Sequence, residues 1–309
     1  MPTRLFLLFF TLAVFAQDSI QNSDFKILTD VELVLLDVSV KDPDGGYVTG
    51  LARDQFQIYE NGVLQKITEF DSGDVPVTVG LVMDNSGSMA PRRQNLIEAG
   101  VAFVEASNPQ DQIFVVNFND KVRRGLPDSI PFTDDVKLLR AALSKQPPEG
   151  QTALYDAVAV ALKHLESGRR DKKALVVVSD GGDTCSTRSN KDVMRLIHES
   201  AATIYTVGIF DPDDPDRNPG VLKRIAGLTG GECFLPGALE PILPICQKIA
   251  RDIRNRYTIG YHPIRTNDKA AERKIRVVAS SPERKKLIVR TRTGYRLPDR
   301  SPIGLVSSK

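Results

Sequence analysis

Residues 77–88 read Val77-Thr78-Val79-Gly80-Leu81-Val82-Met83-Asp84-Asn85-Ser86-Gly87-Ser88. The first part is almost wholly apolar, which is typical of a strand that is buried on both faces of a sheet. Hard oxygen donors follow it at alternate positions, and these are Asp84, Ser86 and Ser88. Mg²⁺ and Ca²⁺ prefer such donors. The stretch therefore predicts a cation site at the end of a core strand, or a cap in which Ser86 or Ser88 begins the helix that starts near Pro91.

The overall composition is typical of a globular protein and gives no sign of a nucleic-acid-binding one. The 309 residues are 41% hydrophobic and 26% charged, as in globular domains with a sizeable core. The 41 basic and 39 acidic residues leave a net charge of +2, so nucleic acid is not expected as a partner. The cysteines, Cys185, Cys233 and Cys246, match no zinc motif. Three cysteines permit one disulfide and one free thiol, and the sequence does not show which two would pair. The alternative is three buried, unreactive thiols.

The N-terminus predicts export. A positively charged start is followed by an apolar run over 5–15 and by the small residue Ala16. The run is too short for a membrane span but fits a secretory signal peptide over 1–16, with a mature chain that begins near Gln17. A retained anchor is the alternative. We expect a periplasmic or extracellular protein, with peripheral association with the cell envelope as a further option.

Residues 75–253 alternate between apolar strands and amphipathic helices. The expected strands cover 77–83, 113–118, 174–179, 203–209 and 232–235, and the expected helices cover 92–106, 136–145, 154–167, 191–201, 219–228 and 239–252. Short connections between strands that are apolar on both faces indicate an α/β fold with a doubly wound, mostly parallel sheet. Ligands of such sheets bind outside the carboxyl ends of the strands, where Asp84 lies.

The flanks of this segment have a different pattern. Residues 25–74 and 254–298 show the period of two that is typical of strands, broken by turn signals such as Asn61-Gly62. Because a sheet of two or three strands is marginal alone, we expect the two flanks to pair into one β-sandwich around the inserted α/β domain. Two separate β modules are the alternative, and 299–309 is expected to be a loose tail.

The C-terminal flank is rich in basic residues, among them Arg290 and Arg292. The alternation at these positions predicts an outward, solvated face that protects the edge of a sheet. Binding of that face to an anionic glycan or envelope surface is the alternative.

Two further loops supply oxygen donors. Thr152 follows a glycine turn directly before an expected helix, and Asp180 follows the apolar strand at 174–179. The strands that end at Asp84 and Asp180 should be neighbours in the sheet. The side chains of Asp84, Ser86, Ser88, Thr152 and Asp180 are therefore expected to converge.

These three motifs, in this order, resemble the von Willebrand factor A (VWA) domain over about residues 75–253, with its metal-ion-dependent adhesion site. The flanking motifs, which include Leu51 to Phe56 and Arg292 to Arg296, resemble the exported bacterial VWFA-related domain proteins, a group described largely from Acidobacteria. The resemblance implies that the five residues bind Mg²⁺, with Mn²⁺ or Ca²⁺ as alternatives. It also implies that the ion accepts an Asp or Glu carboxylate from a partner protein, and that in some relatives the last helix moves.

We therefore expect an exported, non-enzymatic module of the adhesion type, with an envelope assembly or chaperone-like factor as the alternative. A metal-dependent hydrolase is less favoured, because the histidines, His164, His198 and His262, lie outside the strand-end motifs. The acidic loop from Asp211 to Asp216 is expected on the same face as the site, as a solvated turn or as a second cation site. The oligomeric state is left open.

Overall fold

The structure is a computed structural model that describes residues 33–210, 216–237, 242–264, 272–284 and 286–296. These residues all belong to one compact unit, which covers 32–309. The predicted signal peptide at 1–16, the tail at 299–309 and most of the acidic loop at 211–216 lie outside the described residues. Within the described residues, no helix combines the length and the apolar character needed to cross a bilayer.

A six-stranded sheet forms the centre of the α/β part, with the strand order β10-β9-β8-β5-β6-β7. Its strands are β5 (Val77–Asp84), β6 (Gln112–Phe118), β7 (Val122–Arg124), β8 (Lys172–Ser179), β9 (Thr203–Gly208) and β10 (Cys233–Phe234). All neighbouring pairs are parallel except β6 with β7, a short antiparallel edge strand that the sequence did not predict. The predicted mostly parallel α/β sheet is confirmed.

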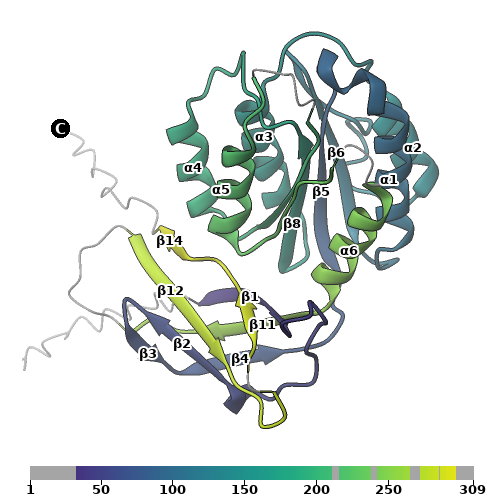
Figure 1. Cartoon of the computed structure of the whole chain (residues 1–309). Coiled ribbons are helices and arrows are strands. Elements are labelled where there is room, and N and C mark those ends of the chain that lie inside the picture. Colours follow the sequence, from purple (N-terminus) through teal and green to yellow (C-terminus); the bar gives the residue numbers. More distant parts are fainter. Residues whose placement is uncertain (1–32, 211–215, 238–241, 265–271, 285, 297–309) are drawn as a thin grey trace, which may run out of the picture. The chain divides into compact units, whose positions relative to one another are not determined.

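Helices cover both faces of this sheet (Figure 1). One face carries α1 (Arg93–Glu105), α2 (Val136–Ser144) and α6 (Ile242–Arg254), and the other carries α3 (Leu154–Glu166), α4 (Asn190–Glu199) and α5 (Pro219–Thr229). This double cover explains the composition of β5, in which every residue is buried. Polar side chains cap three of these helices: Asp135 caps α2, Ser189 caps α4 and Asn218 caps α5.

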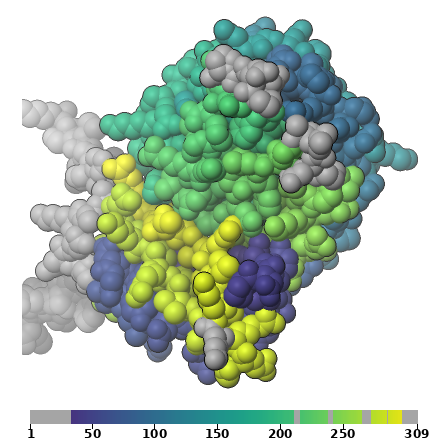
Figure 2. Space-filling model, in the orientation of Figure 1, coloured from purple at the N-terminus to yellow at the C-terminus, as the bar shows by residue number. Residues whose placement is uncertain are grey.

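The segments before and after the α/β part form two antiparallel sheets, with the strand orders β13-β1-β11-β4 and β14-β12-β2-β3. Their strands are β1 (Val34–Lys41), β2 (Phe56–Glu60), β3 (Val63–Gln65), β4 (Ile67–Asp71), β11 (Arg256–Tyr261), β12 (Glu272–Ala279), β13 (Ile288–Arg290) and β14 (Gly294–Arg296). Each sheet thus contains strands from before and after the α/β segment. Figure 2 shows the N-terminal strands, in purple and blue, beside the C-terminal ones, in yellow. Both sheets share one core, which includes Leu36, Ile58 and Tyr257, and we refer to them together as the β-sandwich.

The expected solvated basic face is wrong at Arg290 and Arg292. Both side chains are partly buried. The Arg290 guanidinium lies 3.0 Å from a carboxylate oxygen of Glu232, which directly precedes β10. Arg292 donates a hydrogen bond to the carbonyl oxygen of His198 on α4. These arginines therefore contact the α/β part of the chain. The alternation of residues along a strand does not predict such contacts.

Gly80 allows the close packing at the centre of the sheet. A Cβ atom at this position would lie 2.4 Å from Cζ of Phe114 and 2.6 Å from Cδ2 of Leu175. We expect Gly80→Val to lower the free energy of unfolding by about 1–3 kcal/mol, because overpacking forces neighbouring side chains from their preferred rotamers. A Cβ at Gly227 of α5 meets no atom within 4 Å, so Gly227→Ala should keep or raise stability. Urea unfolding of both variants tests this, and a Gly80→Val protein as stable as the wild type would contradict it.

Candidate functional site

The two predicted carboxylates lie at the same edge of the central sheet. Asp84 is the last residue of β5, and Asp180 directly follows β8. β5 and β8 are parallel neighbours in which Met83 pairs with Val178, so their carboxyl ends lie side by side. The predicted adjacency of the two strands is confirmed.

Hydrogen bonds join the Asp84 loop to Asp180. The backbone N–H of Ser86 donates to Oδ1 of Asp84 at 2.9 Å, which folds the chain back over the end of the strand. Oγ of Ser86 lies 3.1 Å from Oγ of Ser88, and Oγ of Ser88 donates to Oδ2 of Asp180 at 2.8 Å. Ser86 begins the 3₁₀ helix Gly87–Arg92 but makes no side-chain cap bond, so the capping alternative does not hold for it. Four of the five predicted donors therefore form one connected group.

Thr152 is brought to the same place by the backbone of its loop. The carbonyl oxygen of Gly150 accepts a hydrogen bond from the N–H of Gly87 at 3.2 Å. The N–H of Thr152 donates to Oγ1 of Thr184 at 3.0 Å, and its carbonyl oxygen accepts from the N–H of Thr184 at 2.9 Å. Thr152 itself is 7% exposed. The Thr152 loop is thus held between the loops that follow β5 and β8.

The site concentrates negative charge in a buried place. Asp84 is 2% exposed and Asp180 is 4% exposed. Burial raises the pKa of the Asp84 carboxyl to about 7, and the charge of Asp180 adds to this effect, while hydrogen bonds from Ser179 and Ser86 oppose it. Within the described residues, no salt bridge reaches either carboxylate. Two buried carboxylates and three hydroxyls without a basic partner suit a hard divalent cation.

Two supporting residues were missed by sequence reasoning. Ser179 is fully buried, donates to Oδ2 of Asp84 at 2.7 Å and accepts from the N–H of Gly181 at 3.0 Å. It orients Asp84 and the turn that carries Asp180. A polar residue at the end of the apolar strand was a signal for it. The second is Thr184, whose pairing with Thr152 had no signal in the sequence.

Two nearby carboxylates have other partners. Oδ1 of Asp183 accepts from the N–H of Tyr155 at the start of α3 and from Oγ of Ser186. Asp156 accepts hydrogen bonds from Thr187 and forms an ion pair with Arg188 at 2.8 Å. Both residues therefore hold the loop after β8 against α3. They offer matched control positions for the candidate donors.

Residues 79–182 match the family model of the von Willebrand factor type A domain. This part of the chain is a VWA domain. The matched residues include all five candidate donors, from Asp84 to Asp180. The predicted VWA domain is confirmed.

Solved structures support the same fold. A von Willebrand factor type A protein from Catenulispora acidiphila is 14% identical, with 87% of this chain and 74% of that chain covered and a TM-score of 0.50. Proximal thread matrix protein 1 from the mussel byssus is 17% identical, with 63% of this chain and 51% of that chain covered and a TM-score of 0.50. At these identities the likeness shows the fold alone. A search of curated proteins finds no match.

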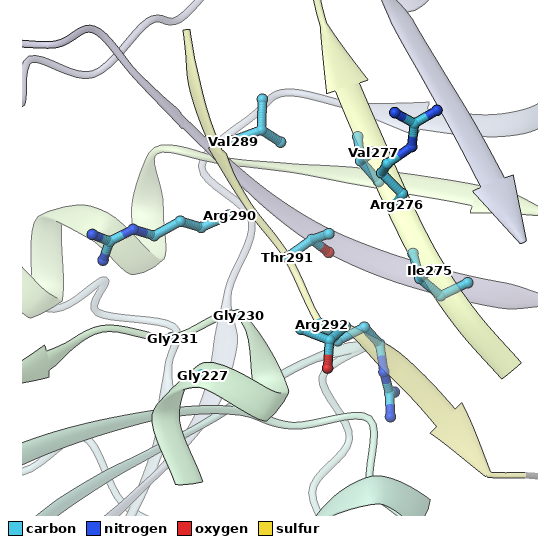
Figure 3. Close-up of a pocket in the computed structure, with 11 residues that line it drawn as sticks. Gly227, Gly230, Gly231, Ile275, Arg276, Val277, Val289, Arg290, Thr291 and Arg292 are labelled. Atoms are coloured by element: carbon cyan, nitrogen blue, oxygen red, sulfur yellow. The ribbon is translucent and has the colours of Figure 1, made fainter. Parts of the chain in front are cut away.

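A different pocket, of about 390 Å³, lies between the end of α5 and strand β12 (Figure 3). Its wall includes Gly230, Ile275 and Val289, and it has no acidic residue. Figure 3 shows the guanidinium groups of Arg276 and Arg290 pointing away from each other and from the space between them. The pocket therefore lacks the carboxylates of the candidate cation site and is separate from the strand-end group.

Proposed function

We propose that the chain is an exported, non-enzymatic binding module that engages a carboxylate of a partner protein through Mg²⁺ held by the VWA domain. The observation that carries this proposal is the hydrogen bond from Ser88 to Asp180. It joins the loops of two neighbouring strands around two buried carboxylates. Among the residues that the structure describes, such a group has an excess of oxygen acceptors and no salt bridge to a basic side chain.

The donor set favours Mg²⁺ over transition metals. Ser86, Ser88 and Thr152 would offer hydroxyl oxygens, while Asp84 and Asp180 would offer carboxylate oxygens, directly or through water. No group of three or more histidine, cysteine or acidic residues that could hold a metal occurs elsewhere in the described chain. Bound at this site, Mg²⁺ would supply a Lewis-acidic position that accepts a further oxygen ligand. Mn²⁺ and Ca²⁺ are the alternatives.

The charge of the site favours an acidic partner. The formal charge of the two carboxylates equals that of a divalent cation with the opposite sign, and the three hydroxyls add no further negative charge. Ser88 is exposed while Asp84 is buried, so the hydroxyl of Ser88 is the more accessible of the two donors. A partner's Asp or Glu carboxylate would add the charge and the oxygen that such an ion attracts.

The histidines give no support to an enzyme. The ring of His164 packs between Phe114 and Phe132, with ring centroids 4.5 and 4.9 Å apart, and it hydrogen-bonds to the carbonyl oxygen of Pro131. No histidine appears among the hydrogen-bond partners that join the strand-end loops. The described hydrogen bonds therefore place no histidine as a general base at these loops.

A pull-down tests the proposal. The purified chain is used as bait in an envelope extract of the source organism, with either MgCl₂ or EDTA present. We expect partners to be retained only with Mg²⁺, to be displaced by excess free glutamate, and to be lost with Asp84→Asn. Asp183→Asn, which changes a neighbouring carboxylate outside the group, should retain them. Equal retention in EDTA would contradict the proposal, as would Mg²⁺-dependent turnover of a phosphate or carboxylic ester that Asp84→Asn abolishes.

A further inference from the structure

The last helix of the VWA domain continues directly into the β-sandwich. α6 ends at Arg254 and β11 begins at Arg256, so Asn255 alone connects them. β11 is a central strand that pairs with β1 on one side and with β4 on the other. One residue spans at most about 3.6 Å, which leaves no slack for the helix to move along its axis relative to β11.

Asp252, in the final turn of α6, is bound by four side chains. Its Oδ1 lies 2.9 Å from Nζ of Lys41 and accepts a hydrogen bond from Oγ of Ser39 at 3.1 Å, both on β1. Its Oδ2 accepts from the hydroxyl of Tyr205 on β9 at 2.6 Å and from Nε of Arg256 at 3.2 Å. Burial alone would raise the pKa of this carboxyl, but Arg256 and Lys41 hold it well below its usual value. The carboxylate is therefore charged, 2% exposed and fully paired.

Lys41 extends this group to a second carboxylate. Its Nζ also lies 2.9 Å from Oε2 of Glu232, just before β10. The same oxygen of Glu232 lies 3.0 Å from Arg290 of β13. Lys41 is 6% exposed. One buried ammonium thus joins β1 of the sandwich to α6 and to the last strand of the central sheet.

Arg256 closes the group on the other side. Its guanidinium donates to the carbonyl oxygens of Gly230, at the end of α5, and of Asp37 on β1. Its own carbonyl oxygen accepts a hydrogen bond from Nζ of Lys172, the first residue of β8, at 3.0 Å. We call Ser39, Lys41, Tyr205, Glu232, Asp252, Arg256 and Arg290 the junction network.

We propose that the β-sandwich holds α6 in one position through the junction network, so that the candidate metal site binds its ion without a shift of this helix. Any axial shift of α6 would pull the Asp252 carboxylate from donors on β1 and β9 and leave buried charges unpaired. It would also pull on β11, which is hydrogen-bonded along both edges. α6 packs against α1, which follows the 3₁₀ helix that contains Ser88, so a fixed α6 supports a fixed site.

The statement about the ion rests on the proposed function, whereas the fixed position of α6 does not. Hydrogen–deuterium exchange of the whole chain separates the two. In EDTA, we expect the amides of 249–254 to exchange slowly in the wild type and about tenfold faster or more in Lys41→Met. Lys163→Met, which removes an 82% exposed ammonium from α3, is the matched control and should exchange like the wild type. Added MgCl₂ should change exchange in the loops at 84–88 and 180–184 but leave 249–254 of the wild type within about twofold.

Two results would overturn the inference. One is exchange at 249–254 of Lys41→Met that stays within about twofold of the wild type in EDTA. The other is a Mg²⁺-induced change of about tenfold at 249–254 in the wild type. If Lys41→Met does not fold, Ser39→Ala takes its place, because it removes a single hydrogen bond to Asp252. The exchange rate at 249–254 should then rise about threefold. Absence of any Mg²⁺ effect in the site loops would count against the proposed function and leave the EDTA comparison valid.

Discussion

Replacing Asp252 with alanine is expected to lower the free energy of unfolding by about 3–5 kcal/mol. The carboxylate accepts from four side chains, and its removal leaves buried Arg256 without its ion pair and buried Lys41 with Glu232 as its remaining carboxylate. An unpaired buried charge costs far more than the net value of the pair that it came from. Urea unfolding of the whole chain measures the loss.

Asp128→Ala is the matched control for this prediction. Asp128 also pairs with an arginine, at 2.6 Å from Arg124, but its side chain is 89% exposed. Its loss should change the free energy of unfolding by less than about 1 kcal/mol, because exposed ion pairs contribute little. An Asp252→Ala protein that loses no more stability than Asp128→Ala would show that the junction network is not a significant source of stability.

The difference between the wild type and Asp252→Ala should also shrink in acid. The folded pKa of Asp252 lies below its unfolded value, so the folded state favours the ionised form. Its contribution is therefore present above about pH 4 and is lost as the pH falls further toward the folded pKa. A difference that grows on acidification would contradict the charge assigned to Asp252.

The second large effect is expected from Mg²⁺ on the wild type. At a concentration of about one hundred times its dissociation constant, an ion that binds only the folded chain raises the free energy of unfolding by about 2.7 kcal/mol. Asp84→Asn should abolish this gain. In EDTA, however, Asp84→Asn should unfold within about 1 kcal/mol of the wild type, because it removes one of two like charges that are buried without a cation.

Asp183→Asn separates a metal effect from a general effect of lost charge. Its carboxylate holds Tyr155 and Ser186 and belongs to no hydrogen bond of the five donors. It should keep the full gain from Mg²⁺. A loss of the gain in both variants would indicate that Mg²⁺ acts through surface charge and not through the strand-end group.

Much of the α/β part could be predicted from the sequence because its signals are local. The run from Val77 to Met83 is apolar on both faces, which is typical of a strand with helices packed on both sides of its sheet. Donors that follow such strands lie at one edge of a parallel sheet, so Asp84 and Asp180 could be placed together before the structure was known. The short edge strand β7 was missed because Val122–Arg124 contains one apolar residue.

The junction network could not be predicted in the same way. Ser39 and Asp252 lie 213 positions apart, and nothing local to either one marks the other. A lysine in a strand, such as Lys41, is most often solvated, and only the fold shows that it is buried between two carboxylates. The same holds for Arg290, whose alternation predicts an outward face until Glu232 is placed beside it. Long-range ionic pairs are set by the tertiary structure, while capping and strand burial are set by neighbours.

Calorimetric titration of the purified chain with MgCl₂, at a pH where Asp84 is ionised, tests the central claim most directly. The proposed site predicts saturable binding of one ion by the wild type and by Asp183→Asn, and no binding by Asp84→Asn or Asp180→Asn. A wild-type chain without saturable binding, or an Asp84→Asn chain with unchanged affinity, would contradict the assignment of these residues to a Mg²⁺ site.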